Sequence, residues 1–264
     1  MPEEFDPDAF RVIDLAIKGF SQIFDHGNLT RPITYLGMVQ VYVVLRAYNL
    51  LKCVRHLLSG GYWEECNILL RTLFELLLTL EHIQREEPEK RAKDFFRRAV
   101  AARLVHIRND LIYQRETGRR VDIESIERIE KHLTTFLREF LDETTFCKQY
   151  LRLKRYTRPY ELTSESARHN PIRKHQYYTL YSEFCEYVHG LPSAVLGDLQ
   201  ALVGSIATDK FLLREKHQIR MVIGLAVTWA IEILFLSIDA LPVSDSDWPL
   251  QVIKEATELL SEHG

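Results

Sequence analysis

A narrow stripe of polar side chains runs along an otherwise apolar stretch between residues 62 and 85. On a helix turning by about 100° per residue, its members fall within about 80° of one another. They are Glu64, Asn67, Arg71, Glu75 and His82. Arg71 and Glu75 are four residues apart and can pair directly, which would hold a guanidinium ready to bind a phosphate. A thin solvent-facing edge of a buried helix gives the same pattern, so both interpretations stay open.

A second polar stripe follows in the segment 177–190, where a further helix is expected. Its core face is formed by Tyr177, Leu180, Tyr181, Phe184 and Val188, and the other stripe by Tyr178, Ser182 and His189. Histidine exchanges protons near neutral pH, so His189 beside an arginine would suit phosphodiester cleavage through a ribose hydroxyl. His189 directly before Gly190 is also an ordinary helix C-terminus, where an imidazolium interacts with the helix dipole.

The basic charge of the chain is concentrated between residues 149 and 181. Seven basic against two acidic residues give this window +5, which leaves −8 for the rest of a chain with net charge −3. Tyrosines are interleaved with the cations, as expected where phosphates are neutralised and bases stack, so we predict RNA as a partner. The predicted binding side chains are Arg152, Lys154, Arg155, Arg158, Arg168 and His175, with Tyr178, Tyr181 and Ser182. A surface loop paired with acidic helices has the same composition.

No metal and no cofactor are predicted from the motifs. Glu186 and His189 have the spacing that di-metal helical bundles use, but such bundles need this motif twice and the sequence holds one copy. The absence of a G-x-x-x-x-G-K loop excludes a P-loop nucleotidase. The four cysteines have no C-x-x-C spacing and are interpreted as reduced thiols in the core. They are Cys53, Cys66, Cys147 and Cys185.

Two short motifs also carry a resemblance. Arg71-Thr-Leu-Phe-Glu75 lies on an apolar helix, and Tyr178, Tyr181-Ser182 and His189-Gly190 follow about a hundred residues later. The chain thereby resembles, over roughly residues 35–240, a bacterial family known only as a domain of unknown function. That family is more distantly similar to HEPN helical domains, many of which are metal-independent ribonucleases of toxin and antiviral systems. The resemblance implies a HEPN-like helical core and ribonuclease activity in bacterial defence.

The HEPN signature, an arginine followed by a histidine on one helix, is nearly matched between Arg168 and His175. Pro171 between them is expected to break that helix. The predicted catalytic site is therefore a composite one between helices. Arg71 binds the phosphate, Glu75 orients Arg71, and His189 acts as general acid or base.

These side chains must be positioned by helices, because apolar periodicity and helix signals predict an all-α fold of about eight or nine helices. We expect a single domain over residues 1–264, with an N-terminal helix within 1–30, a bundle core over 33–241 and a C-terminal helix over 245–263. Helices within the core are expected over 33–58, 62–85, 88–118, 122–155, 175–189 and 221–241. A weaker helix is expected after residue 190, ending at about residue 207. A long loop is expected over 156–174, where Pro159 and Pro171 interrupt the helical period.

The chain is predicted to be cytoplasmic, with no secretion signal and no membrane partner. Its most apolar stretch, 221–241, contains Glu232 and Asp239, which favours a buried helix over a membrane span. A helical chain of this kind can form a homodimer, although no heptad run specifies one. The leading hypothesis is a HEPN-like RNA-binding protein or metal-independent ribonuclease. The alternative is a non-catalytic helical module that docks on a protein partner.

Overall fold

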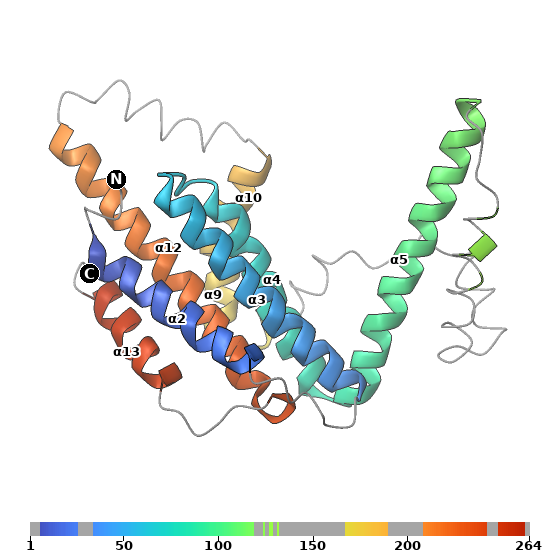
Figure 1. Cartoon of the computed structure of the whole chain (residues 1–264), viewed down its shortest axis with the longest axis horizontal. Helices are drawn as coiled ribbons and strands as arrows, with labels where there is room; N and C mark the ends of the chain where they lie inside the picture. Colours follow the sequence, from blue (N-terminus) through green and yellow to red (C-terminus); the bar gives the residue numbers. More distant parts are fainter. Residues whose placement is uncertain are drawn as a thin grey trace. The chain divides into compact units, whose positions relative to one another are not determined.

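The structure of the protein is a computed structural model. It describes residues 6–25, 34–118, 167–189, 208–241 and 248–261, with 124, 127, 128 and 131 as isolated positions. These residues form helices and contain no strand, which confirms the all-α prediction (Figure 1). The elements are α2 (Pro7–Asp25), α3 (Tyr35–Ser59), α4 (Cys66–Arg85), α5 (Pro88–Glu116), α9 (Pro171–Gln176), η2 (Tyr177–Tyr181), α10 (Ser182–His189), α12 (Thr208–Leu236), η3 (Ile238–Ala240) and α13 (Trp248–Ser261).

The helix boundaries follow from capping residues that are visible in the sequence. Asp6 accepts a hydrogen bond from the backbone N–H of Ala9 (3.3 Å), and Pro7 follows as the first residue of α2. Thr34 caps α3 by accepting one from the N–H of Gly37 (3.0 Å). After α3, Gly61 takes a φ of 83°, a left-handed conformation that glycine adopts without strain. The predicted first four helices are confirmed to within a few residues at each end.

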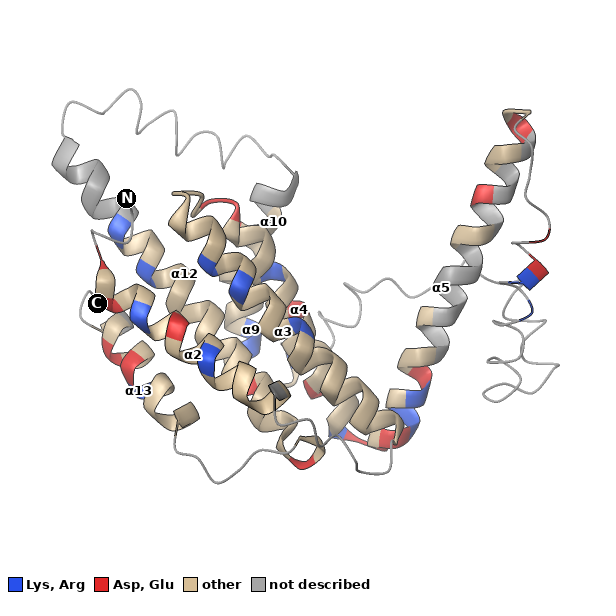
Figure 2. Ribbon diagram, in the orientation of Figure 1, with Lys and Arg blue, Asp and Glu red and all other residues tan. Residues whose placement is uncertain are grey.

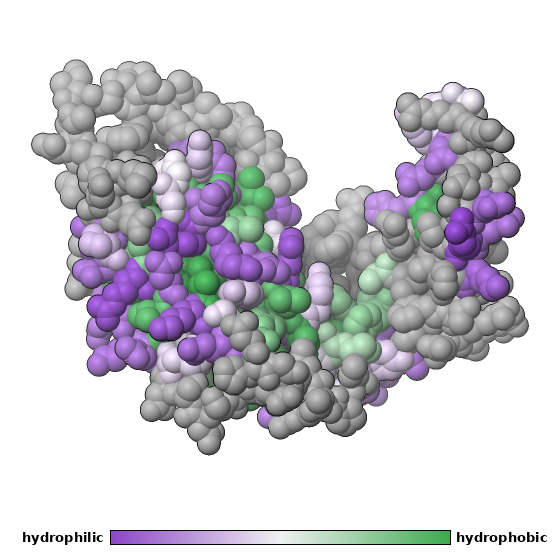
Figure 3. Space-filling model, viewed as in Figure 1, coloured by the Kyte–Doolittle hydropathy of each residue, from purple (hydrophilic) through white to green (hydrophobic). Residues whose placement is uncertain are grey.

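The chain divides into two compact units, residues 1–82 with 162–264, and residues 83–161. In the first unit, α12 packs against α2, α3 and α13 (Figure 1). Its side chains Trp229 and Ile231 are fully buried, as are Phe20 of α2 and Leu51 of α3. Burial of these apolar faces from water is the main stabilising force of such a bundle. Hydrophilic residues predominate among the described residues on the face of this unit that Figure 3 shows.

The second unit is described mainly through α5. This helix is rich in charge, and its first residues form ion pairs between Lys90 and Glu87 (2.7 Å) and between Arg91 and Glu86 (2.8 Å). Both pairs involve solvated side chains and therefore contribute little to stability. The predicted helix over 88–118 is confirmed, whereas the single-domain organisation stays a prediction.

Helices α2, α12 and α13 are held together by specific contacts as well as by apolar burial. Gly19 lies against the ring of Trp248, where a Cβ atom would clash, so glycine allows α2 and α13 to approach closely. The ring of Trp248 meets Phe20 edge-on at 5.8 Å between centroids. The buried Asp6 also pairs with Arg220 of α12. The start of α2 is therefore anchored to the central helix.

The predicted loop over 156–174 is wrong at its C-terminal end. The side chain of Asn170 accepts hydrogen bonds from the N–H groups of Ile172 (3.0 Å) and Arg173 (3.5 Å), and Pro171 is the first residue of α9. Pro171 therefore starts a helix here instead of breaking one, since the first helical N–H needs no partner. The helices expected over 122–155 and after 190 lie outside the described residues, apart from isolated positions, so the total of eight or nine stays a prediction.

The cysteines do not share one environment. Cys66 is buried, and burial, followed by the charge of Glu65, raises the pKa of its thiol to about 12. Cys53 is exposed on α3, so its interpretation as a core thiol is wrong; it precedes the buried Val54 on the solvent side of that helix. Cys185 is half-buried, and Cys147 lies outside the described residues.

One helical stretch among the described residues, Lys216–Leu236, is long and apolar enough to cross a membrane. About six-tenths of its most apolar window, 61%, is buried inside the fold. Core helices of soluble proteins and membrane spans share this length and composition. The cytoplasmic location therefore stays a prediction.

Candidate functional site

The candidate site lies where helix α4 meets a continuous helical rod made of α9, η2 and α10. Contacts between them run in opposite sequence directions. Arg173 pairs with Glu81, Tyr181 bonds to Glu75, and Cys185 lies close enough to Arg71 to raise the pKa of its guanidinium. The rod is therefore antiparallel to α4. Each later turn of the rod lies beside an earlier turn of α4.

The rod contains a π-helical turn, η2, directly at the site. Such turns insert an extra residue into a helix and change which side chains share a face. Here the rings of Tyr177 and Tyr181 stack at 4.8 Å with an interplanar angle of 14°. Tyr181 is 5% exposed, and its ring also lies 6.1 Å from the buried Phe74 of α4. The turn therefore directs the Tyr181 hydroxyl toward α4.

Arg71, Glu75 and Tyr181 form a connected polar cluster. The Arg71 Nε–H donates to Glu75 Oε1 (3.2 Å), which confirms the pairing predicted from their spacing. The Tyr181 hydroxyl donates to the same oxygen (2.7 Å). The guanidinium carbon of Arg71 lies 5.2 Å from the centre of the Tyr181 ring, within the range of a cation–π contact. One carboxylate oxygen and one aromatic ring thus fix the arginine from two sides.

The electrostatics of the cluster keep the tyrosine neutral and the arginine charged. Burial, followed by the hydrogen bond to Glu75, raises the pKa of the Tyr181 hydroxyl well above 10. Burial by itself lowers the pKa of Arg71, but the neighbouring Tyr181, Cys185 and Glu75 outweigh it and raise that pKa. At neutral pH the site therefore holds a charged guanidinium beside a neutral phenol that acts as a donor.

Arg71 keeps binding capacity after these contacts are made. Its side chain is 22% exposed, and Glu75 is the one carboxylate that pairs with it among the described residues, through Nε. A guanidinium has five N–H donors in a planar fork that matches phosphate and carboxylate groups. An arginine oriented through Nε can present its terminal nitrogens to an anion.

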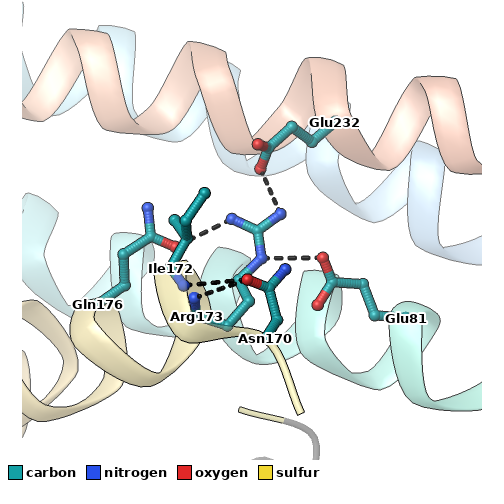
Figure 4. Close-up of polar contacts among 6 residues, drawn as sticks. All are labelled: Glu81, Asn170, Ile172, Arg173, Gln176 and Glu232. Carbon is teal, nitrogen blue, oxygen red and sulfur yellow. Dashed lines mark hydrogen bonds and ion pairs between the residues drawn. The ribbon is translucent and has the colours of Figure 1, made fainter. Parts of the chain in front are cut away.

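A second arginine cluster lies further along the same two elements (Figure 4). Arg173 is 6% exposed and donates to Glu81 (2.8 Å), to Glu232 of α12 (2.9 Å) and to the side-chain oxygen of Gln176 (2.9 Å). The basic window predicted for RNA binding included this arginine, and the structure buries it instead. Its donors are engaged on three sides, so this cluster joins three helical elements and offers little to a ligand.

The other residues singled out in the sequence differ in their surroundings. Tyr178 is 60% exposed, and Ser182, Arg168 and His175 are also exposed, so these four lie on the surface of the rod or just before it. Asn67 of the α4 stripe is 3% exposed and therefore buried. His189 ends α10, but its side chain lies outside the described residues, as do Glu186, Arg152, Lys154, Arg155 and Arg158.

In the part of the chain that the structure describes, no group of three or more His, Cys, Asp and Glu side chains is arranged to hold a metal ion. The residues that sequence reasoning missed are Tyr177, Cys185, Glu81 and Arg173. Tyr177 and Cys185 lie one turn on either side of Tyr181, a signal that helical spacing provides. The contacts of Arg173 join segments distant in sequence and leave no such signal.

The fold and this cluster define an all-α protein with an oriented, partly exposed arginine on a buried helix. The chain belongs to a family of unknown function (DUF5677), whose sequence model matches residues 38–203 and so includes both Arg71 and Arg173. No curated protein shows a significant match to the chain, and no solved structure does.

Proposed function

We propose that the protein binds RNA and cleaves it without a metal, as HEPN-like ribonucleases do. The observation that carries this proposal is Arg71, which is fixed by Glu75 and the Tyr181 ring yet remains 22% exposed. Arginines held in this way bind the phosphate group of a nucleic acid with defined geometry. Glu75 is the positioning residue that orients Arg71.

The proposed reaction uses the ribose 2′-hydroxyl as the nucleophile. His189 accepts its proton, the 2′-oxygen attacks the phosphorus, and the bond from phosphorus to the 5′-oxygen breaks. The leaving 5′-oxygen takes a proton from water. The products carry a 2′,3′-cyclic phosphate and a 5′-hydroxyl. Arg71 neutralises the charge that develops on the phosphoryl oxygens, which is the kind of stabilisation expected from a pre-oriented donor.

The antiparallel register supports the choice of His189. Tyr181 lies opposite Glu75, and Cys185 lies beside Arg71. One further turn along α10 leads to the backbone of His189, and one further turn back along α4 leads to Asn67. The backbone of His189 thus lies about one helical turn, roughly 5.4 Å along α10, beyond the residue that lies beside Arg71.

A non-catalytic interaction module is the second candidate. It is favoured by two large side chains on the outer side of the rod, Ile172 (66% exposed) and Tyr178 (60% exposed). Exposed apolar and aromatic groups of this kind commonly mark protein interfaces. This candidate predicts a stoichiometric protein partner and no turnover of RNA.

Cleavage of labelled single-stranded RNA in EDTA separates the two candidates. The wild type is compared with Arg71→Ala, His189→Ala and the control Arg11→Ala, which removes an exposed arginine of α2 (65% exposed side chain). We expect cleavage by the wild type and the control, with a loss of about 100-fold or more in the other two. Unchanged cleavage by His189→Ala rules out the role of that histidine. No cleavage by any form leaves the interaction module as the better account.

A further inference from the structure

The exposed face of α3 has an unusual charge pattern. The 25-residue helix contains Arg46, Lys52, Arg55 and His56 and not one Asp or Glu. The exposed side chains along it include Tyr42, Leu45, Arg46, Lys52 and His56. Solvent-facing helices usually mix both signs, because acidic and basic residues three or four apart stabilise each other. In Figure 2 the ribbon of α3 carries blue basic positions among tan ones.

The contacts around α3 leave this face positively charged. Arg55 is paired with Asp14 of α2 (2.8 Å), so it does not contribute to the surface charge. Lys52 lies over the ring of Tyr48 at 4.2 Å, a contact that leaves its charge uncompensated. Within the described residues, no carboxylate forms an ion pair with Arg46, Lys52 or His56. Tyr42, one turn before Arg46, is 51% exposed.

We propose that this α3 face, formed by Tyr42, Leu45, Arg46, Lys52 and His56, is a docking surface for a single-stranded RNA. The proposal rests on the RNA-binding function and extends it to a second surface of the same unit. From Arg46 to Lys52 the helix advances six residues, or about 9 Å. These two cations can therefore contact more than one phosphate of a single strand. The tyrosine provides a ring for base stacking at the end of the row of cations.

The same observations disfavour other occupants. A second copy of the chain would bring two faces of equal sign together across a two-fold axis, which is repulsive. A lipid surface would need a broad apolar face beside the cations, whereas Tyr42 and Leu45 are the large hydrophobic side chains exposed on α3. A linear polyanion requires only the row of cations and the ring.

The test is the salt dependence of binding to a fluorescent 20-nucleotide single-stranded RNA, measured by anisotropy. Arg46→Ala/Lys52→Ala is compared with the control Lys18→Ala/Lys254→Ala, which removes the same charge from exposed positions of α2 and α13. Each lost phosphate contact reduces the slope of log affinity against log salt by about 0.7. We therefore expect the α3 variant to lose about 1.4 in slope and about tenfold in affinity. The control should retain the wild-type slope.

Arg71→Ala, measured in parallel, separates this inference from the proposed function. If Arg71→Ala weakens binding but the α3 variant binds with the wild-type slope, the docking surface is wrong and the proposed function stands. If the wild type binds no RNA at all, the proposed function fails and the docking surface fails with it. Retention of the protein by vesicles containing phosphatidylserine, without binding to RNA, would also overturn the docking surface in favour of a lipid partner.

Discussion

Arg71 and Arg173 lie along the same two helical elements, α4 and the α9–α10 rod, yet their surroundings differ. Arg173 is 6% exposed and donates to two carboxylates and one amide oxygen. The Arg71 side chain is 22% exposed and pairs with one carboxylate through a single nitrogen. The donors of Arg173 are engaged by the fold. Arg71 is oriented by the fold and keeps donors for a ligand.

This difference separates a structural role from a functional one. A buried charge is tolerated when it is fully paired, and removing it leaves its partners without compensation. A partly exposed arginine costs less to remove, because water can solvate the partners that remain. Removal of Arg173 should therefore reduce stability more than removal of Arg71 does. Removal of Arg71 should reduce RNA binding more.

The largest expected effect is the loss of stability in Arg173→Ala. Glu81 and Glu232 would lose their common cation, and we expect the free energy of unfolding to fall by about 3–5 kcal/mol. Arg71→Ala should lose about 1 kcal/mol. Urea titration followed by circular dichroism measures both values. Equal losses in the two variants would remove the distinction between the clusters.

The next effect concerns the hydrogen bond that fixes Glu75. Tyr181→Phe removes the hydroxyl that donates to this carboxylate (2.7 Å) and should lower the free energy of unfolding by about 1.5–3 kcal/mol. The stacked ring against Tyr177 is kept in this variant, so the change reports the hydroxyl. A loss as small as that of an exposed Tyr178→Phe control would show that the hydroxyl does not stabilise the cluster.

The same substitution should alter the response to alkali. The pKa of Tyr181 is raised above its ordinary value of 10.0, so the fold favours the protonated phenol. The stability gained in this way is fully present below pH 10 and is lost as the pH rises through the folded pKa. The wild type should therefore lose stability more steeply than Tyr181→Phe between pH 9 and pH 11 in urea titrations. Parallel curves would contradict the raised pKa.

The smallest effect is expected at Glu232, on the acid side. Burial raises the pKa of this carboxyl, and the nearby Glu81 raises it further. Arg173 lowers it, but the pKa still lies above the ordinary value of 4.5. The stability from this raised pKa is present below pH 4.5 and is lost as the pH rises through the folded pKa. The stability of the wild type relative to Glu232→Gln should therefore decrease from pH 4 to pH 7. A difference that grows over this range would show that the pairing with Arg173 dominates.

The sequence was sufficient for contacts within one helix and insufficient for contacts between distant ones. The pair Arg71–Glu75 was predictable because residues four apart share a helix face. The burial of Tyr181 followed from the apolar spacing of its segment. Arg173 was misassigned to a basic surface because its partners are 92 and 59 residues away in the chain. The π turn at 177–181 has no sequence signal of its own and decides where the Tyr181 hydroxyl lies.

The start of α9 at Pro171 could also not be predicted from the composition of its segment. Pro171 disrupts a helix in its interior and favours one at its first position, and the deciding feature is the side chain of Asn170 that caps the next turn. Asn before Pro is a helix start signal, but it stands inside a window whose charges and prolines are typical of a loop.

The central claim is that Arg71 is a phosphate-binding residue, and RNA affinity tests it most directly. Equilibrium binding of single-stranded RNA in EDTA is measured for the wild type, Arg71→Ala and Arg71→Lys, with Arg11→Ala as the control. We predict a loss of about tenfold or more for alanine, as for a charged hydrogen bond, and a smaller loss for lysine, which keeps the charge but not the fork. Wild-type affinity in a folded Arg71→Ala protein would contradict the account.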